Sequence, residues 1–417
     1  MDKLVIEGGR ILSGNISISG SKNAVLPIMV ATIIEPGKYT IKRVPKLRDT
    51  LTMIKLLEII GAKVELNDDV LKIDTNNCNN PEAPYDLVKT MRASFYVLGP
   101  FLSRFGYAKV SMPGGCAWGP RPINFHLDAI KQIGAKVDLS DGYILAKGDK
   151  LKGGEIVFPV SSVGATGNAV MAAVKVNGIT KIINAAIEPE ITCLCEFLNN
   201  MGANIAGIGT NQLTIEGVEK LVPVDCEIIP DRIEAATFLI AGAMKGEDLV
   251  VDNVDPNHLK VITKQLKNTG CELKINSNSI QISKGKKIKP VSIETAIYPG
   301  FPTDVQAQWM ALMSLAKGSS TIVDAVYHDR FTHIAELSRL GAKINLKYNV
   351  AQIKGVKRLY GTSVMSTDIR ASASLIIAGL AAEGKTEVSR IYHIDRGYEN
   401  IEEKFNSIGA SIKRVKE

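Results

Sequence analysis

One cysteine, a residue type suited to covalent and acid–base chemistry, lies in the irregular segment MPGGCAWGPRPINFHLDAI at residues 112–130. Prolines and glycines surround Cys116, and Arg121 follows five residues later. A cysteine in a glycine-rich loop near an arginine has a lowered thiol pKa and an accessible sulfur. The alternative is an inert buried cysteine, which usually lies in a helix or strand. We therefore expect Cys116 to be reactive.

A second candidate stands at the start of an apolar segment, where Ser21, Lys22 and Asn23 follow Gly20. A lysine beside the free N–H groups of a helix N-terminus is suited to bind an anion. The alternative is a solvated lysine in the first helical turn. Lys22 alone therefore does not define a site.

Further along the chain, an acid and several arginines precede apolar helical segments. Asp304 follows Phe301-Pro302-Thr303, where its alternative role is to cap the helix. Arginines at helix openings favour binding of phosphate and carboxylate groups, although each one alone could be a surface ion pair. These arginines are Arg92, Arg232, Arg330, Arg370 and Arg396.

Other chemistries find little support in the sequence. It contains no GxxxxGK[ST] phosphate loop, no HExxH and no GxSxG motif. The five histidines are scattered, and His126 and His393 are interpreted as packing or hydrogen-bonding residues. Cys193 and Cys195 diverge on a helical pattern and do not predict a metal site. We expect no metal and no cofactor.

The elements that position these residues repeat along the chain. An amphipathic helical segment ends in glycine, a small residue follows, and a strand comes next, as in LLEIIGAKVEL and IKQIGAKVDL. Each glycine stands where a helix C-terminus needs a positive φ angle. Six such glycines occur 68–73 residues apart: Gly61, Gly134, Gly202, Gly270, Gly341 and Gly409.

Each unit also contains a more apolar helix and a strand hairpin. Segments such as DRIEAATFLIAGAMKG are apolar nearly all round, as expected for helices inside a domain. Asp, Asn, Ser and Gly at the hairpin tips are typical turn residues. The last unit lacks its return strand, and the N-terminal KLVIEGG resembles the return strand QLTIEGV of the third unit. We expect the N-terminal strand to complete the sixth unit.

This pattern predicts an α/β fold of six units of about 70 residues, with helices inside and small sheets outside. Two pseudo-threefold domains of three units fit better than a six-unit solenoid, because the chain closes on itself. One domain would span residues 21–229 and carry the Cys116 loop. The other would be discontinuous, with residues 1–20 and 230–417, and would carry Asp304, Arg370 and Arg396.

Composition restricts the class of protein. The 417 residues are 45% hydrophobic and 22% charged, as in globular proteins, and the formal net charge is +7. So mild an excess does not indicate a nucleic-acid partner. No apolar stretch suggests a signal peptide or a membrane span, and the cysteines lack paired spacing. We expect a cytoplasmic protein with reduced thiols and no membrane partner.

Together, these segments resemble the enolpyruvyl transferase family from end to end, and within it the members that act on UDP-N-acetylglucosamine. The loop with its cysteine and the HIDRGY segment are the most specific matches; 5-enolpyruvylshikimate 3-phosphate synthases share the repeats but lack both. The matching segments are SGSKNAVLP, PGGCAWGPRP, SSVGATGNAVMAA, EPEI, PDRIEA, FPTDVQAQ, HDRF, STDIRASASL and YHIDRGYENIEEK.

The resemblance implies two inside-out α/β barrels of three repeats each. It also implies transfer of the enolpyruvyl group of phosphoenolpyruvate to the 3′-hydroxyl of UDP-N-acetylglucosamine, with release of phosphate. This reaction is the first committed step of peptidoglycan synthesis. The implied partners are these two small molecules, and no oligomeric state follows. By the same resemblance, the adduct-forming cysteine makes the enzyme a fosfomycin target.

The resemblance also assigns roles. Cys116 would be the general acid, Asp304 the base for the sugar hydroxyl, and Asn23 a substrate-orienting amide. The catalytic cations Lys22 and Arg396, with Arg121, would neutralise phosphate and carboxylate, and Arg330 and Arg370 would add anion contacts. The nucleotide sugar would lie against Arg92, Arg121, Pro122, Ile123, Asn124, Phe125, Ser162, Val163, Gly164, Asp304 and Val326.

Two positions depart from the family pattern. Val160 and Ser161 stand where some members carry a lysine, so one nucleotide-phosphate contact is missing or replaced. Trp118 stands where a smaller aliphatic residue is expected. Two rival functions remain: a shikimate-pathway synthase of the same fold and a non-catalytic UDP-sugar sensor. Intact Lys22, Cys116, Asp304 and Arg396 argue against the sensor.

Overall fold

The computed structural model describes residues 2–112 and 123–416. Two units of similar size make up the chain. We call residues 20–229 the central unit, and residues 1–19 with 230–417 the terminal unit. The chain therefore passes from one unit to the other twice, next to Ser19 and next to Ile229.

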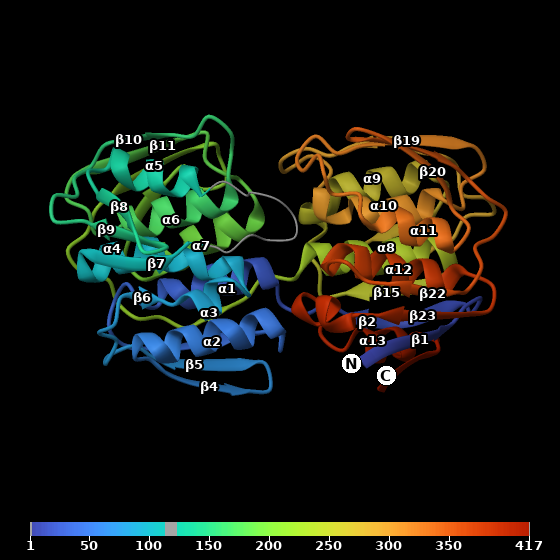
Figure 1. The fold of residues 1–417 in the computed structure, drawn as a ribbon, viewed down its shortest axis with the longest axis horizontal. Helices are drawn as coiled ribbons and strands as arrows, with labels where there is room; N and C mark the ends of the chain where they lie inside the picture. The colour runs from blue at the N-terminus through green and yellow to red at the C-terminus, as the bar shows by residue number, and fades with distance from the viewer. Residues whose placement is uncertain (1, 113–122, 417) are drawn as a thin grey trace. The chain divides into compact units, whose positions relative to one another are not determined.

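Six four-stranded sheets share one strand pattern, three in each unit (Figure 1). In every sheet an edge strand runs parallel to its neighbour, and the next two pairings are antiparallel. The central sheets are β14 (Cys226–Glu227), β3 (Lys38–Lys42), β5 (Val70–Asp74) and β4 (Lys63–Asn67); β6 (Glu82–Ala83), β7 (Tyr107–Ser111), β9 (Tyr143–Lys147) and β8 (Lys136–Ser140); and β10 (Glu155–Val157), β11 (Ile179–Ile183), β13 (Gln212–Glu216) and β12 (Asn204–Ala206).

The terminal unit repeats that order with strands from both ends of the chain. Its sheets are β2 (Leu12–Ser17), β15 (Gly246–Asp252), β17 (Ser279–Ser283) and β16 (Glu272–Ile275); β18 (Ile293–Glu294), β19 (Ser319–Val323), β21 (Val350–Lys354) and β20 (Lys343–Lys347); and β22 (Ser363–Met365), β23 (Lys385–Ser389), β1 (Asp2–Glu7) and β24 (Ile412–Lys416).

The N-terminal strand completes the last repeat, as predicted. β1 pairs antiparallel with β23 on one side, where Leu4 faces Val388, and with β24 on the other, where Val5 faces Lys413. It occupies the sheet position that β13 has in the third repeat. The six-unit α/β fold is therefore confirmed.

One nearly apolar helix per repeat lies inside its unit, with the sheets around it (Figure 1). Almost every residue of these helices is buried, including Trp309 in α10, because no face points to water. The central unit contains α1 (Lys22–Ala31), α4 (Leu98–Phe105) and α6 (Val163–Ala173), and the terminal unit contains α8 (Arg232–Lys245), α10 (Gln306–Met313) and α12 (Ile369–Ala381).

The amphipathic helices follow one per repeat, and the predicted glycines end them with φ between 94° and 110°. They are α2 (Arg48–Ile60), α5 (Asn124–Gln132), α7 (Pro189–Asn200), α9 (Lys260–Asn268), α11 (His333–Arg339) and α13 (Ile401–Ser407). Short helices complete the chain: α3 (Tyr85–Val88), η1 (Arg92–Val97), η2 (Pro256–Leu259), η3 (Thr303–Val305) and η4 (Ile391–Arg396). None of the helices in the described ranges has the length and apolarity needed to cross a bilayer.

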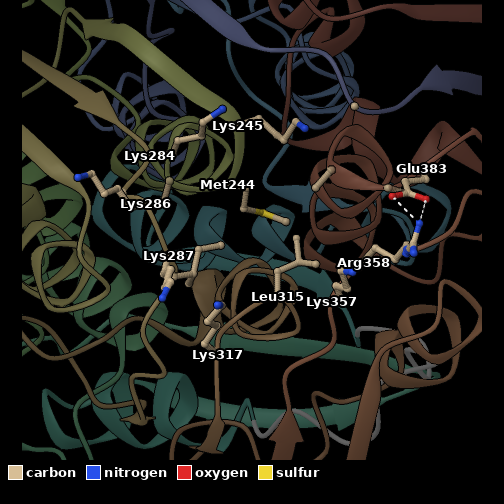
Figure 2. Close-up of a pocket in the computed structure, with 16 residues that line it drawn as sticks. Met244, Lys245, Lys284, Lys286, Lys287, Leu315, Lys317, Lys357, Arg358 and Glu383 are labelled. Atoms are coloured by element: carbon tan, nitrogen blue, oxygen red, sulfur yellow. Dashed lines mark hydrogen bonds and ion pairs between the residues drawn. The ribbon is translucent and has the colours of Figure 1, made fainter.

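An open pocket of about 560 Å³ lies in the terminal unit where its three inner helices end (Figure 2). Met244 and Lys245 line it from the last turn of α8, and Leu315 follows α10. Ala381 contributes the end of α12. Lysines from the intervening loops surround these residues.

A buried histidine stands at the start of α11. His333 is 1% exposed, and its ring stacks on Phe331 with centroids 6.4 Å apart. Burial lowers the pKa of His333 to about 4, although Asp368 and Asp324 oppose this shift and Arg330 adds to it. His333 is therefore neutral at physiological pH.

Glycine at the helix ends gives a first prediction. Gly202 has φ +102° and open space around it, so Gly202→Ala adds only backbone strain, about 1–2 kcal/mol. At Gly61, φ is +110° and a Cβ would also lie 2.8 Å from the Asn77 carbonyl oxygen. Urea unfolding should therefore show a larger loss of stability for Gly61→Ala. Equal losses in the two variants would contradict this structure of the turn.

His333 gives a second prediction, on pH dependence. Its pKa is lower in the folded chain than the unfolded value of about 6.5, so its stabilising contribution is complete above that pH and is lost as pH falls toward 4. At pH 5 the loss amounts to about 2 kcal/mol. Denaturant unfolding at pH 7 and pH 5 should show that His333→Phe loses less stability than wild type. The same loss in both proteins would assign the acid sensitivity to other groups.

Candidate functional site

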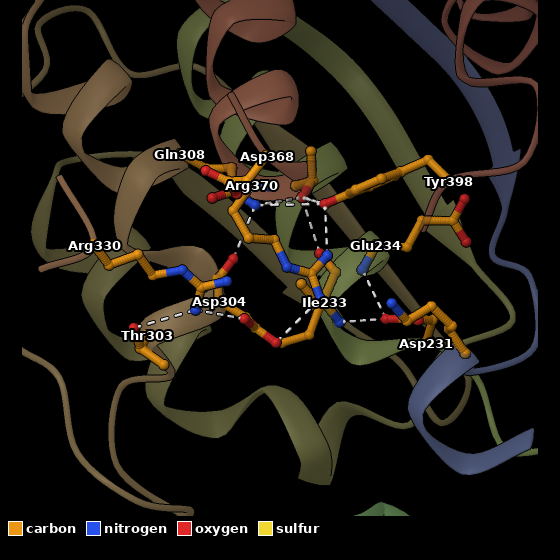
Figure 3. Close-up of polar contacts among 12 residues, drawn as sticks. Asp231, Ile233, Glu234, Thr303, Asp304, Gln308, Arg330, Asp368, Arg370 and Tyr398 are labelled. Atoms are coloured by element: carbon orange, nitrogen blue, oxygen red, sulfur yellow. Dashed lines mark hydrogen bonds and ion pairs between the residues drawn. The ribbon is translucent and has the colours of Figure 1, made fainter. Parts of the chain in front are cut away.

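Asp304 in the terminal unit is held between two arginines (Figure 3). Its Oδ1 lies 2.6 Å from an amino nitrogen of Arg330, and its Oδ2 lies 3.1 Å from one of Arg370. Arg370 is 6% exposed, whereas the Asp304 side chain keeps 27% of its surface open. Three groups that the sequence separates by 66 residues therefore form one charged cluster.

The electrostatics of this cluster fix the charge of Asp304. Burial favours the neutral acid, but the Arg370 and Arg330 guanidiniums outweigh it and hold the pKa of Asp304 well below its usual range. The alternative in which Asp304 caps a helix is wrong. Pro302 is the N-cap of η3 and Val305 that of α10, and Asp304 points to the arginines instead.

A buried hydrogen-bond network ties the starts of the three inner helices together behind Asp304. Gln308 Nε2 donates to the Asp304 carbonyl at 3.1 Å and to Thr237 Oγ1 at 3.1 Å. The Tyr398 hydroxyl lies 2.7 Å from Thr237 Oγ1 and accepts from Arg370 at 3.5 Å. Because α8, α10 and α12 each contribute a member, the network fixes their relative positions at this end.

Asp324, which the sequence did not single out, orders the loop that carries Val326 and Arg330. The carboxylate is fully buried and accepts hydrogen bonds from the N–H groups of Val326 (3.1 Å) and Tyr327 (2.8 Å). It also accepts from Thr303 Oγ1 at 2.7 Å, and Arg330 donates to that same hydroxyl at 3.3 Å. Asp324 therefore aligns Arg330 with the segment that carries Asp304.

Side-chain caps hold two of these helices at the site end. Asp231 accepts from the N–H groups of Ile233 and Glu234, and Asp368 accepts from those of Arg370 and Ala371. Arg396 ends η4. The next residue, Gly397, packs so closely on the first turn of α12 that a Cβ there would lie 2.8 Å from Ile369 Cγ2. The predicted Arg396 thus lies in a segment packed beside the first turn of α12.

In the central unit, Lys22 and Asn23 begin α1, and Lys22 is not a solvated lysine. Its ammonium lies 2.9 Å from an oxygen of Asp49, which is 4% exposed in the first turn of α2. The side chain of Lys22 retains only 13% of its surface. This lysine is therefore a partly buried cation with a carboxylate partner.

His126 joins two segments predicted to bind substrate. Asn168 Nδ2 donates to its Nδ1 at 2.8 Å, so the neutral ring carries its proton on Nε2. The Asn168 carbonyl oxygen accepts from the N–H of Gly99. A Cβ at Gly164 would lie 3.0 Å from the His126 ring, which explains the glycine there. The packing role expected for His126 is confirmed.

The consequence is that the start of α5, with Ile123, Asn124 and Phe125, lies beside the start of α6. Ser162 caps α6, with its hydroxyl accepting from the N–H of Ala165 at 3.4 Å, and Val163 and Gly164 follow. Arg92 is the first residue of η1, which precedes α4. Candidates in both units therefore cluster at the N-terminal ends of inner helices.

Four sequence-predicted residues lie outside the described residues: Cys116, Trp118, Arg121 and Pro122. The five described cysteines are free, four of them buried and Cys226 partly so. Burial raises the pKa of Cys193 to about 11 and those of Cys195 and Cys226 to about 12, and it also raises those of Cys78 and Cys271. Among residues 2–112 and 123–416, no three His, Cys, Asp or Glu side chains gather in a way that could hold a metal ion.

Sequence reasoning missed Asp324, Asn168, Gln308 and Tyr398. Asp324 had a usable signal, because an Asp directly after a strand commonly bonds the backbone two residues on. Gln308 and Asn168 lie within apolar helices, where a buried amide needs partners. Their partners come from other repeats, and no local pattern identifies them.

Comparisons with known proteins identify the family to which this chain belongs. A family model described as EPSP synthase (3-phosphoshikimate 1-carboxyvinyltransferase) matches residues 6–405. UDP-N-acetylglucosamine 1-carboxyvinyltransferase of Chloroherpeton thalassium is 54% identical over 99% of this chain and 97% of its own. The protein of the same name from Geobacter metallireducens is 52% identical, with both chains fully covered.

Solved structures agree. The enolpyruvyl transferase NikO from Streptomyces tendae superposes with a TM-score of 0.89 at 25% identity, over 99% of both chains. EPSP synthase from Acinetobacter baumannii covers both chains fully with a TM-score of 0.78, and at 18% identity it supports the fold alone. The model match and the full-length relatives together show that this chain belongs to the EPSP synthase family of enolpyruvyl transferases.

Proposed function

We propose that the protein transfers the enolpyruvyl group of phosphoenolpyruvate to the 3′-hydroxyl of UDP-N-acetylglucosamine and releases phosphate. The observation that carries this proposal is identity of 52–54% with relatives named for that activity, over essentially the whole chain. The reaction begins peptidoglycan synthesis. The free thiols of the described cysteines support a reducing compartment, the cytoplasm.

The reaction requires addition followed by elimination. In the addition, the sugar oxygen bonds to C2 of phosphoenolpyruvate, the hydroxyl proton leaves, and a proton is added to the methylene carbon. In the elimination, that carbon loses a proton, the C2–O bond to phosphate breaks, and the double bond returns. Both steps need a proton donor and acceptor among groups that stabilise anions.

Asp304 is the proposed base for the sugar hydroxyl. Its low pKa keeps it ionised and ready to accept a proton, but the two arginines also make it weakly basic in the free protein. An anionic substrate gives Arg330 and Arg370 other partners. As their hold on Asp304 weakens, its basicity rises, so binding of phosphoenolpyruvate prepares the base.

Cys116 is the proposed acid that protonates the methylene carbon of phosphoenolpyruvate. Its thiolate can then add to C2, the carbon made electron-deficient by that protonation, to form a covalent adduct. Lys22, Arg121 and Arg396 are proposed to neutralise the phosphate and carboxylate, and Asn23 to orient the substrate. Lys22, like Arg330 and Arg370, is already paired with a carboxylate, that of Asp49. A bound anion would be a second partner for its ammonium group.

The nucleotide sugar is proposed to bind at helix N-termini in the central unit. The first turn of the 11-residue α6 presents backbone N–H groups, which favour a phosphate at Ser162, Val163 and Gly164. This backbone contact is proposed to replace the phosphate contact that other members make through a lysine at the position of Val160. The remaining proposed contacts are Arg92, Arg121, Pro122, Ile123, Asn124, Phe125, Asp304 and Val326.

Phosphate release from phosphoenolpyruvate tests the function directly. We expect release with UDP-N-acetylglucosamine and none with shikimate 3-phosphate. Because the family model carries the name of the shikimate-pathway synthase, that acceptor is the necessary control. Release with shikimate 3-phosphate alone would contradict the proposal, and release with neither would favour a non-catalytic sensor.

Asp304→Asn tests the base. We expect turnover to fall by about two to four orders of magnitude, as for a general base. Because Arg370 then lacks a charged partner in a buried position, stability should also fall, by about 1–3 kcal/mol. Steady-state kinetics and urea unfolding measure the two effects.

The matched control is Glu294→Gln, the same carboxylate-to-amide change at an exposed position of the terminal unit, and it should leave both quantities unchanged. If Asp304→Asn loses stability but keeps near-normal turnover, Asp304 is only a structural partner of the arginines.

Cys116 is tested by labelling with fosfomycin, a phosphonate epoxide. We expect Cys116 alone to react, because burial keeps the five other thiols protonated at neutral pH. Peptide mass spectrometry locates the label. A label on any of those five, with Cys116 untouched, would contradict the assignment.

Two replacements of this cysteine separate labelling from catalysis. Cys116→Asp should abolish labelling and retain activity, because a carboxylic acid still donates a proton. Cys116→Ser should lose both, because a hydroxyl is too weak an acid. Full activity of Cys116→Ser would remove the proton-donor role.

A further inference from the structure

The pocket at the C-terminal ends of α8, α10 and α12 is strongly cationic (Figure 2). One glutamate lines it, and Glu383 is already paired with Arg358 at 2.8 Å. Two of the three repeats of the terminal unit supply lysines from their strand-end loops, and two inner helix ends supply the others. The six lysines are Lys245, Lys284, Lys286, Lys287, Lys317 and Lys357.

Ion pairs do not balance the charge of these lysines. Within residues 2–112 and 123–416, none of the six forms an ion pair. Burial and the nearby charge of Lys284 lower the pKa of Lys245, so these two ammonium groups are close enough to repel. Like charges gathered around one cavity raise its affinity for anions.

Helix ends do not account for this charge. The C-terminus of a helix carries about half a negative charge, so three ends balance only about one and a half positive charges. More than four charges of the six lysines therefore remain uncompensated. Stabilising the helix ends explains one or two lysines, not six.

The central unit provides an internal comparison, because two cations at its own inner helix ends have partners in the protein. Arg104 there donates to the carbonyl oxygens of Ile33, Thr75 and Cys78, at 3.0–3.1 Å. Lys175 pairs with Glu35 at 3.0 Å. Cations at this end of a unit can therefore find partners within the fold, whereas the six lysines of the terminal pocket form no ion pair within residues 2–112 and 123–416.

The backbone holds the cationic loops in place. The N–H of Lys284 donates to the Gly246 carbonyl at 2.9 Å, and that of Lys317 donates to the Ile288 carbonyl at 2.8 Å. A Cβ at Gly285 would lie 2.2 Å from the Gly270 carbonyl oxygen, so this loop packs directly against the turn that ends α9. The backbone from which the lysine side chains extend is therefore held in place around Met244 and Leu315.

We propose that this pocket binds a small polyphosphate anion, a chain of phosphates such as inorganic polyphosphate or a nucleoside triphosphate carries. The cavity volume of about 560 Å³ suits such a ligand, and the lysines can contact several phosphates at once. A nucleic acid would need a longer basic surface, whereas these charges converge on one cavity. The site is separate from Asp304, because α8 spans 14 residues, about 20 Å, between the two ends.

Isothermal titration with inorganic tripolyphosphate and with ATP tests this proposal without any turnover. We expect one site, weakened by added salt because the interaction is electrostatic. Lys286→Gln/Lys287→Gln/Lys357→Gln should weaken binding at least tenfold, and Lys317→Glu, just after α10, should do the same alone. Binding of ATP more tightly than tripolyphosphate identifies the nucleotide as the preferred source, and the reverse identifies inorganic polyphosphate.

The matched control changes three exposed lysines of the same unit, Lys343, Lys347 and Lys354, to glutamine, and should alter affinity less than twofold. Equal weakening by the control would reduce the effect to general charge. Competition by millimolar phosphoenolpyruvate would place the anion at the proposed active site instead. Absence of binding, or tighter lysine-dependent binding of a 12-nucleotide DNA strand, would also overturn the proposal. None of these results depends on whether the enzyme assay succeeds.

Discussion

The arrangement depends on one constraint: three apolar helices are buried side by side in each unit with the same polarity, so their unsatisfied N–H groups gather at one end and their carbonyl groups at the other. In the terminal unit, Asp231 and Asp368 cap the first end and leave it able to hold charged side chains. At the opposite end, cations are favoured. The charged cluster of Asp304, Arg330 and Arg370 and the lysine-lined pocket therefore both result from the parallel packing of these helices.

The cluster of Asp304, Arg330 and Arg370 combines charges that would each be unfavourable without their partners. Arg370 is buried and would be costly without Asp304, while burial would raise the pKa of Asp304 if its arginines were absent. Tyr398 and Gln308 restrict how far either can move. A site of this kind is rigid in its backbone, yet its ion pairs can be exchanged for those of an incoming anion. That combination suits a reaction in which charge moves between substrate atoms.

Much of the fold followed from local patterns, since a helix-ending glycine such as Gly341 needs positive φ wherever it stands, and six evenly spaced copies define six repeats. The placement of β1 also followed, because its sequence resembled another return strand. The ion pairs did not. Asp304, Arg330 and Arg370 could be singled out by residue type, but the pairing of one acid with two arginines, and the capping role that this excludes, depend on distances between repeats. Asp324 was missed for a different reason, because its local signal, an Asp directly after a strand, was present and was not used.

The position of β1 has a consequence for synthesis on the ribosome. This strand is made long before its sheet neighbours, β23 and β24. Residues 20–229 contain all three of their own sheets, with every strand drawn from within that range, so they can fold while translation continues. β1 must meanwhile wait, unpaired, for β23, which begins at Lys385, whereas β2 can pair once β15 is complete at Asp252. Nascent-chain folding is thus ordered from the middle outward, and the terminal unit closes only once β24 has been made.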